Sequence, residues 1–508
     1  MKITKSDLEI KGENEMNTFM NTMKSMNNYG YTENGAVTHR STMNKVLDMF
    51  AMGGAYRNRT DADCILLFKD AYEAHPTLAL RCLFYLRDAR GGQGERRFFR
   101  VCFNWLAKTH PSVAKKQIEH ISEYGRWDDV IYTCHDTPVW TAAMSAIRAQ
   151  LALDVQCKTP SLLAKWLPSE NASSHETKRM ANEVRSFLNM SHKEYRKTLS
   201  VLRARINVLE RLMSANRWDE IEFDKIPSRA GFIYKNAFAR RDLIAKKYEA
   251  FAKSAETKVN AKVLYPHEIA HNAFAFRGDD IERAMIQKYW DNLPDYYNGA
   301  EENGLAIVDT SGSMSGQPLE VAVSLGAYVA ERGHGPFANH FVTFSSHPEL
   351  IEFNGVDIVD KFNRARRADW QMNTDLKAVF DMLLNVARNQ KTKPEDMPTR
   401  LYIFSDMEFD GCIFGQRDWW ERPTNAMNKV NTLLENIKVE WARAGYTLPQ
   451  VVFWNLNARN NNIPAIGEGF SYVSGFSPSM IETILSGKDG IDLMLQKLNS
   501  DRYSNICA

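Results

Sequence analysis

The stretch LAIVDTSGSM at residues 305–314 decides the fold of the second part of the chain. Four successive apolar residues are typical of a buried strand in a parallel sheet, and the polar run after them marks the strand's carboxyl end. In doubly wound sheets, ligands bind beyond these carboxyl ends. The side chains of Asp309, Ser311 and Ser313 therefore form a candidate binding site.

Two further segments extend this site. The apolar run LYIF at residues 401–404 ends in Ser405 and Asp406, so a second carboxylate follows a second strand. Between these strands, Thr374 stands just before an expected helix at 376–389. Two carboxylates and three hydroxyls make an all-oxygen set, which suits Mg²⁺ or Mn²⁺ rather than zinc. The expected metal ligands are Asp309, Ser311, Ser313, Thr374 and Asp406.

Apolar runs and helical stretches alternate around this site. Strands are predicted at 305–308, 340–344, 350–353, 401–404 and 451–455, and helices at 319–331, 376–389, 425–443 and 480–485. Continuous apolar strands separated by helices indicate a parallel sheet that is covered on both faces. The pattern predicts an α/β domain over residues 299–508 with a doubly wound, Rossmann-like sheet.

Residues 46–298 have the periodicity of helices instead. Apolar residues recur at three- and four-residue spacing, and glycine or proline separates the segments. Helices are predicted at 61–75, 76–88, 95–108, 111–124, 137–153 and 192–213. The string GRWDDVI at 125–131 returns as NRWDEIE at 216–222, which favours stacked helical repeats. Residues 1–45, rich in Asn, Met, Lys and Thr, are expected to be a weakly ordered lead-in.

The composition of the 508 residues excludes several classes of protein. Hydrophobic residues at 44% and charged residues at 25% are values of a globular chain. The most apolar stretch, 319–330, is shorter than the ~20 residues that a bilayer requires, and the first residues lack the apolar run of a secretion signal. Seven cysteines without a C-x-x-C pair indicate reduced thiols. A cytoplasmic protein is therefore expected (in the host cytoplasm, if a phage encodes it).

Charge is distributed unevenly along the chain. Residues 1–300 carry a net charge of +9 and residues 301–508 a net charge of −7, although the whole chain carries only +2. Opposite charges on the two parts suggest separate roles, and a basic part is suited to an anionic partner. Solvated helix faces would give the same count.

The most distinctive helical segment is RDARGGQGERRFFR at residues 87–100, a glycine-rich turn flanked by arginines. Guanidinium groups bind phosphate in a fork geometry, and neighbouring aromatic rings suit RNA. The structural alternative is a tight turn in which Arg87 pairs with Asp88 or Glu95. The candidate RNA-binding residues are Arg87, Arg90, Arg96, Arg97, Arg100, Arg126, Lys165, Arg196, Lys197 and Arg203.

The Asp-x-Ser-x-Ser run at 309–313, together with Thr374 and Asp406, resembles the metal-ion-dependent adhesion site of von Willebrand factor A domains. This resemblance implies a metal with one open coordination position, often filled by a carboxylate of a protein partner. It does not imply catalysis.

The strings RDARGGQGER at 87–96, YGRWDD at 124–129 and LAKWLP at 163–168 resemble TROVE-type proteins such as the Ro autoantigen. They are still closer to a TROVE-like family of plants, microbes and phages. The resemblance implies HEAT-like helical repeats in a ring or arc, which bind single-stranded or small structured RNA. It also implies that the A domain completes the ring, so we expect a compact monomer.

Residues 267–271 contain the His-Glu-x-x-His signature of zinc metalloproteases. On a helix, His267 and His271 would share a face and bind zinc, with Glu268 as general base. The extended signature lacks its third histidine here, although Glu282 and the pair at 301–302 follow downstream. Protease activity is therefore the least favoured interpretation.

These observations predict a non-enzymatic RNA-binding scaffold with a Mg²⁺ or Mn²⁺ site, no catalytic residues and no membrane contact. Its expected parts are the lead-in at 1–45, a TROVE-like helical-repeat domain at 46–298 and a von Willebrand A-like domain at 299–508. The alternative is a protein–protein interaction scaffold that uses the metal site without RNA.

Overall fold

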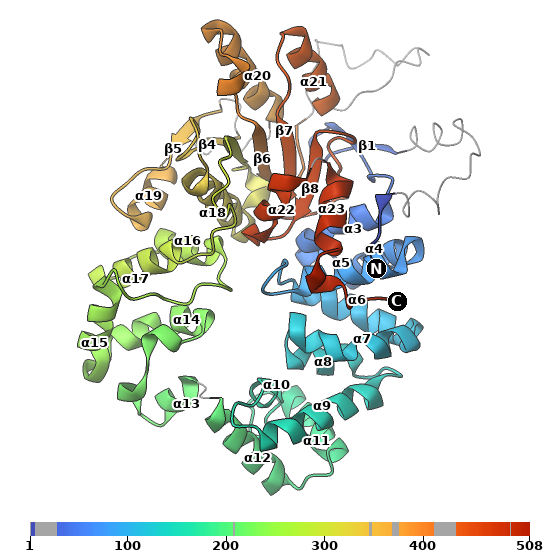
Figure 1. Cartoon of the computed structure of the whole chain (residues 1–508), viewed down its shortest axis with the longest axis vertical. Helices are drawn as coiled ribbons and strands as arrows, with labels where there is room; N and C mark the ends of the chain where they lie inside the picture. The colour runs from blue at the N-terminus through green and yellow to red at the C-terminus, as the bar shows by residue number, and fades with distance from the viewer. Residues whose placement is uncertain are drawn as a thin grey trace. The chain divides into compact units, whose positions relative to one another are not determined.

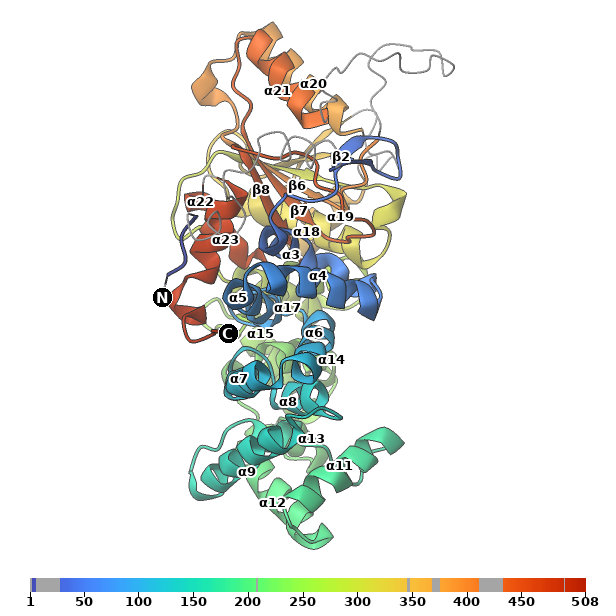
Figure 2. The ribbon, with the colours of Figure 1, turned by 90° about the vertical axis from the view of Figure 1, so that its right-hand side faces the viewer.

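A computed structural model of the chain describes residues 2–5, 28–206, 209–344, 348–367, 375–410, 433–487 and 489–508 (Figures 1 and 2). The chain forms two compact units. The first comprises Met1–Cys82, Leu264–Arg277 and Leu293–Cys507, and the second comprises Leu83–Val263 and Gly278–Asn292. The three-part division at residues 45 and 298 is a different partition of the chain and stays a prediction.

A six-stranded sheet forms the centre of the first unit. Its strands are β3 (Gly304–Val308), β4 (His340–Thr343), β5 (Leu350–Glu352), β6 (Arg400–Ser405), β7 (Gln450–Asn455) and β8 (Phe470–Ser474). They lie in the order β5-β4-β3-β6-β7-β8, and every neighbouring pair is parallel except β4 with β5. In chain order this is 3-2-1-4-5-6, the doubly wound arrangement, whose direction of winding switches between β3 and β6. The predicted fold class, a helical region followed by a doubly wound α/β domain, is confirmed.

Helices cover both faces of this sheet (Figure 2). On one face lies α18 (Gln317–Arg332), which approaches so closely that a Cβ atom on Gly326 would stand 2.4 Å from a methyl group of Val308. On the other face, α23 (Gly490–Leu498) brings Gly490 against the ring of Tyr472, beside α3 (Lys45–Met52). Only glycine permits such approach without a shift of the neighbours. The remaining helices of the unit are α4 (Asp61–Ala74), α16 (Pro266–Phe274), α19 (Ile358–Ala365), α20 (Leu376–Gln390), α21 (Leu433–Arg443) and α22 (Ile481–Ser486).

An N-terminal hairpin also belongs to the first unit. It consists of β1 (Tyr29–Tyr31) and β2 (Val37–His39), which pair antiparallel, and it falls within the predicted lead-in. Asn34 and Gly35 lie in its turn, and an Asn-Gly pair between β-forming residues is a strong local signal for a hairpin. The hairpin bonds to residues far along the chain, with bridges from Gly35 to Asp410 and from His39 to Ile463.

The second unit is built from helices. They are α5 (Pro76–Arg87, from Leu83 onward), α6 (Arg96–Thr109), α7 (Pro111–Tyr124), α8 (Trp127–Cys134), α9 (Trp140–Gln156), α10 (Leu163–Trp166), α11 (His175–Phe187), α12 (His192–Arg205), α13 (Leu209–Ser214), α14 (Ser228–Ala239), α15 (Asp242–Lys253) and α17 (Asp280–Asp291). Edge-to-face contacts of Phe84 with Phe99, Phe103 and Tyr124 tie α5, α6 and α7 into one core. Among the described residues, no helix is long and apolar enough to cross a membrane.

Candidate metal centre and arginine cluster

Two carboxylates meet at the topological switch point of the sheet. Asp309 follows β3 and Asp406 follows β6, and these strands are direct neighbours in register from Gly304 with Arg400 to Val308 with Phe404. The backbone N–H of Asp309 donates to the carbonyl of Phe404 at 3.0 Å. The sequence-predicted pair is thus brought together at the sheet edge where doubly wound folds bind ligands.

The Asp309 carboxylate is fully buried and held on both oxygens. Its Oδ1 accepts from the Ser311 backbone N–H at 2.9 Å, and its Oδ2 accepts from the Ser405 hydroxyl at 2.5 Å. Burial, followed by the negative charge of Asp406, raises the pKa of Asp309 to about 6. The local fold therefore orients this carboxylate while keeping its charge energetically costly.

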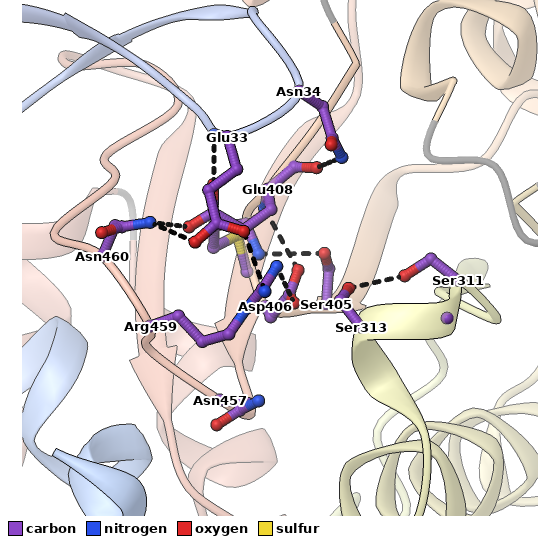
Figure 3. A network of polar contacts seen from close by, with 12 residues as sticks. Glu33, Asn34, Ser311, Ser313, Ser405, Asp406, Glu408, Asn457, Arg459 and Asn460 are labelled. Atoms are coloured by element: carbon purple, nitrogen blue, oxygen red, sulfur yellow. Dashed lines mark hydrogen bonds and ion pairs between the residues drawn. The ribbon is translucent and has the colours of Figure 1, made fainter.

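Asp406 is also buried but is less well satisfied (Figure 3). Its Oδ1 accepts from the backbone N–H of Glu408 at 3.2 Å. Its Oδ2 has no hydrogen-bond partner within the described part of the chain, and the nearest cation is Arg459 Nη2 at 3.4 Å. Burial raises the pKa of Asp406, against hydrogen bonding by Ser313 and attraction to Arg459. A buried carboxylate oxygen without a donor fits a position that a cation would complete.

Two serine hydroxyl groups lie near these carboxylates. The Oγ atoms of Ser311 and Ser313 lie 3.0 Å apart on the turn that precedes α18. The residues that would hold a hard cation are therefore Asp309, Ser311, Ser313 and Asp406, an all-oxygen set. Thr374, the fifth predicted ligand, lies outside the described residues.

The turn of the N-terminal hairpin closes over the second carboxylate (Figure 3). Glu33 pairs with Arg459 Nη1 at 2.8 Å, so one guanidinium connects Glu33 to Asp406. Asn460 donates to both Glu33 and Glu408 at 2.9 Å, and the Glu33 backbone N–H donates to Glu408 at 2.8 Å. The contribution of Glu33 and Arg459 to this site could not be predicted from the sequence, because no local sequence signal shows that residues 426 positions apart are neighbours.

The His-Glu-x-x-His residues lie on α16 but serve different contacts. The imidazole of His267 is buried against Phe476, with ring centroids 5.2 Å apart. Glu268 accepts from the backbone N–H of Tyr265 at 3.0 Å, which caps the helix start, and His271 bonds Glu320 at 2.8 Å. Among the described residues, no three His, Cys, Asp or Glu side chains are grouped to hold a metal ion.

The glycine-rich segment in the second unit forms a tight turn between α5 and α6. Its backbone folds back on α5, with Gln93 N donating to the Tyr85 carbonyl and Glu95 N to the Leu86 carbonyl. A Cβ atom on Gly92 would lie 1.9 Å from the Tyr85 carbonyl oxygen. The glycines of this segment are therefore explained by the tight turn that they form. The arginines that flank the turn have other roles, which differ from one residue to the next.

We expect Gly92→Ala to destabilise the protein, because the added methyl group collides with backbone that cannot move alone. Overpacking of this kind costs about 3 kcal/mol. Urea unfolding followed by circular dichroism measures the change. A midpoint equal to that of the wild type would contradict the close packing of this turn.

Arg87 is an interior residue and not a surface ligand. Its Nε and Nη2 bind Asp129 Oδ2 at 2.8 and 2.6 Å, and both side chains are buried. The expected pairing with Asp88 or Glu95 is thus replaced by a partner 42 residues away. Arg100 completes the network with bonds to Asp129 at 2.6 Å and Asp128 at 2.9 Å. Burial acts to raise the pKa of Asp129, but Arg87 and Arg100 outweigh it and hold that pKa below its usual value.

Two further guanidinium groups in this cluster have no carboxylate of their own. In the described residues, neither Arg96 nor Arg126 has an ion-pair partner, and the buried Nε of Arg96 has no hydrogen-bond acceptor. Desolvation and repulsion from Arg100 lower the pKa of Arg96, and desolvation and repulsion from Arg96 lower that of Arg126 to about 10. We call Arg87, Arg96, Arg100 and Arg126 the arginine cluster; the ion pairs found for it among the described residues are those of Arg87 and Arg100 with Asp128 and Asp129.

The other predicted RNA ligands are spread over this unit. Arg90 is exposed and donates to the Glu123 carbonyl, Arg97 is half-buried, and Lys165 lies beside the Trp166 ring. Arg196 and Lys197 are exposed on α12. Arg203 uses its guanidinium internally, bonding the carbonyls of Ala164 and Leu167 and the hydroxyl of Ser169. Lys165 and Arg203 line one cavity together with Asp128, which binds Arg100.

Comparison with known proteins assigns the chain to a family. The family described as "Domain of unknown function (DUF2828)" matches residues 32–126 and 113–298, more than half of the chain. This chain belongs to the DUF2828 family. The rest of the DUF2828 protein matches a second description, "Domain of unknown function (DUF7788)", over residues 303–504.

Two known proteins are similar to this DUF2828 protein over nearly its whole length. "Uncharacterized protein L728" of Acanthamoeba polyphaga mimivirus is 30% identical and matches 91% of this chain and 86% of its own. The crystal structure of the Ro (RSR) protein of Deinococcus radiodurans is similar with 13% identity and a TM-score of 0.47, covering 91% of this chain and 100% of that one. The resemblance to von Willebrand A domains is not tested by these comparisons and stays a prediction.

The two family matches divide the candidate residues of this DUF2828 protein. The arginine cluster and Glu33 fall within the DUF2828 span, whereas Asp309, Asp406 and Arg459 fall within the DUF7788 span. The contact of Glu33 with Arg459 therefore joins residues from both matched regions inside one compact unit.

Proposed function

We propose that this protein is a non-catalytic scaffold that binds RNA through its helical unit. The observation that carries the proposal is the arginine cluster, in which Arg96 and Arg126 form no ion pair with any described carboxylate. A partly buried excess of guanidinium groups is costly unless an anion completes it. Phosphate oxygens match the guanidinium fork. Trp166, whose ring centroid lies 4.2 Å from Arg126 Cζ, adds the aromatic surface that distinguishes an RNA site from a simple phosphate site.

Fluorescence anisotropy with a labelled single-stranded RNA tests this function. Binding is expected to weaken steeply with salt, because each neutralised phosphate releases condensed counterions. A protein that binds no RNA at micromolar concentration in low salt would refute the proposal.

A second function, cation-dependent binding of a protein carboxylate, is favoured by the carboxylate pair at the switch point. Support comes from the buried Asp406 Oδ2 without a donor and from the hydroxyls of Ser311 and Ser313 beside Asp309. We propose that these oxygens hold Mg²⁺ or Mn²⁺. A bound cation would supply a charge that attracts an acidic side chain of a partner.

Arg459 is expected to weaken cation binding at this site, because its guanidinium already stands 3.4 Å from Asp406 Oδ2. Arg459→Gln removes that positive charge while keeping a polar side chain of similar reach. Calorimetric titration should then give Mg²⁺ affinity at least several-fold higher than in the wild type. Lys393→Gln, on an exposed turn of the same unit, serves as the matched control. Lower affinity in Arg459→Gln would mean that the guanidinium supports the metal site instead.

A further inference from the structure

A cavity of about 280 Å³ opens beside the arginine cluster, within the second unit. Its wall combines the aromatic rings of Tyr132 and Trp166 with the polar groups of Asp128 and Lys165. The volume is near the lower end of the ~300–1,000 Å³ that small-molecule sites occupy, so the cavity has room for one planar ring system and little more.

A guanidinium group lies over the ring of each of these two aromatic side chains. Arg126 Cζ lies 4.2 Å from the centroid of Trp166, and Arg100 Cζ lies 4.4 Å from the centroid of Tyr132. Tyr132 is an exposed large aromatic side chain, and Trp166 is half-buried. Rings and guanidinium planes are the two kinds of surface on which proteins stack unpaired bases. The cavity wall therefore contains two aromatic side chains of the kind on which bases stack.

Asp128 gives the cavity a polar preference. Its Oδ2 accepts from Arg100, but its buried Oδ1 has no hydrogen-bond partner among the described residues. A carboxylate oxygen only accepts hydrogen bonds. It suits a base whose edge presents an amino group, as adenine, guanine and cytosine do, and it repels the two carbonyl oxygens that flank the single N–H of uracil. Of the amino-bearing bases, the two-ring purines offer the larger face for stacking on aromatic side chains.

We propose that this cavity binds one amino-bearing purine base of single-stranded RNA, stacked at Trp166 and Tyr132, with the adjoining phosphate at Arg96 and Arg126. The inference rests on the proposed RNA-binding function and names a base-specific subsite within it. Phosphate contacts give salt-dependent affinity for any sequence, and the cavity adds discrimination between bases.

The test compares labelled oligo(A) and oligo(U) of equal length by fluorescence anisotropy. The wild type should bind oligo(A) more tightly. Trp166→Ala and Tyr132→Ala should each weaken oligo(A) binding about tenfold, which is the effect of losing one stacked base, and change oligo(U) binding much less. Asp128→Asn places a hydrogen-bond donor at the same position. The ratio of the affinity for oligo(A) to the affinity for oligo(U) should therefore be smaller in this variant than in the wild type.

Matched controls separate this inference from the general function. Tyr234→Ala removes a half-buried aromatic ring of α14 that does not line the cavity, and it should leave both affinities unchanged. No binding of either RNA by the wild type would refute the RNA function itself. Salt-dependent binding that treats oligo(A) and oligo(U) alike, and that the cavity variants leave intact, would overturn the purine subsite alone. Circular dichroism melting of each variant excludes loss of fold as the cause.

Discussion

Asp309→Asn should abolish Mg²⁺ binding. The carboxylate is fully buried, and its two oxygens accept from the Ser311 backbone N–H and from the Ser405 hydroxyl. Asparagine keeps one acceptor oxygen for the Ser311 N–H, its amide group can donate to the Ser405 hydroxyl, and it lacks the charge that attracts the cation. Asp309→Ala would leave the donors without an acceptor at a cost of about 1–3 kcal/mol, which would confuse metal loss with unfolding. Isothermal titration with MgCl₂ gives the readout, and retained affinity in the variant would contradict the site.

Stability without metal provides a second readout for the same substitution. The raised pKa of Asp309, about 6, means that the folded protein holds this proton more tightly than the unfolded chain, where aspartate titrates near pH ~4. Its contribution to stability is therefore complete below about pH 4 and is lost as the pH rises through about 6. Without metal, the Asp309→Asn variant should not lose this contribution to stability as the pH rises through about 6. At pH 8 it should therefore melt at a higher temperature than the metal-free wild type.

The double substitution Arg96→Gln with Arg126→Gln should weaken RNA binding by at least tenfold. Two phosphate contacts disappear, and the slope of log affinity against log salt should fall by about 1.4, since each contact contributes ~0.7 on a single strand. Glutamine avoids placing new negative charge beside Asp128 and Asp129. Arg100 is left unchanged, because its bonds to both aspartates are structural.

The fold is expected to survive this double substitution, because the two guanidinium groups repel each other and have no carboxylate partners among the described residues. Lys246→Gln with Lys258→Gln, which removes two exposed positive charges elsewhere in the unit, is the control for general charge effects. Equal losses in both double variants would mean that RNA senses overall charge, and that the arginine cluster is no specific site.

Much of the architecture could be predicted from hydrophobic periodicity. The apolar run at 305–308 became β3 (Gly304–Val308), and the helix expected at 111–124 is α7. The sheet strand β8 (Phe470–Ser474) was not predicted. β8 is an edge strand, and its sequence of aromatic, serine and valine residues is a weaker signal than the continuous apolar runs of the central strands, although all its residues are buried.

The candidate sites were predictable to different degrees. Carboxylates at strand ends are a local signal that topology turns into proximity, so Asp309 and Asp406 could be paired from the sequence. The roles of the arginines could not be predicted, because nothing in the local sequence shows that Arg87 and Arg100 bind Asp129. The place of Tyr132 in the cavity wall could likewise not be predicted, because the other aromatic side chain of that wall, Trp166, lies on a different helix.

The first compact unit contains residues from both ends of the chain, and this affects how the protein folds during synthesis. The Gly54 N–H donates a hydrogen bond to the hydroxyl of Ser474, and Arg81 Nε donates one to the carbonyl of Ile506. The Ile3 N–H donates to the side-chain oxygen of Asn499. On a ribosome that adds ~5–20 residues per second, the first 82 residues emerge well before the strands on which they pack. For tens of seconds, their apolar faces lack the partners that bury them in the finished protein. Chaperone capture of nascent chains should therefore concentrate on this early segment, and slowing translation should lengthen its exposure.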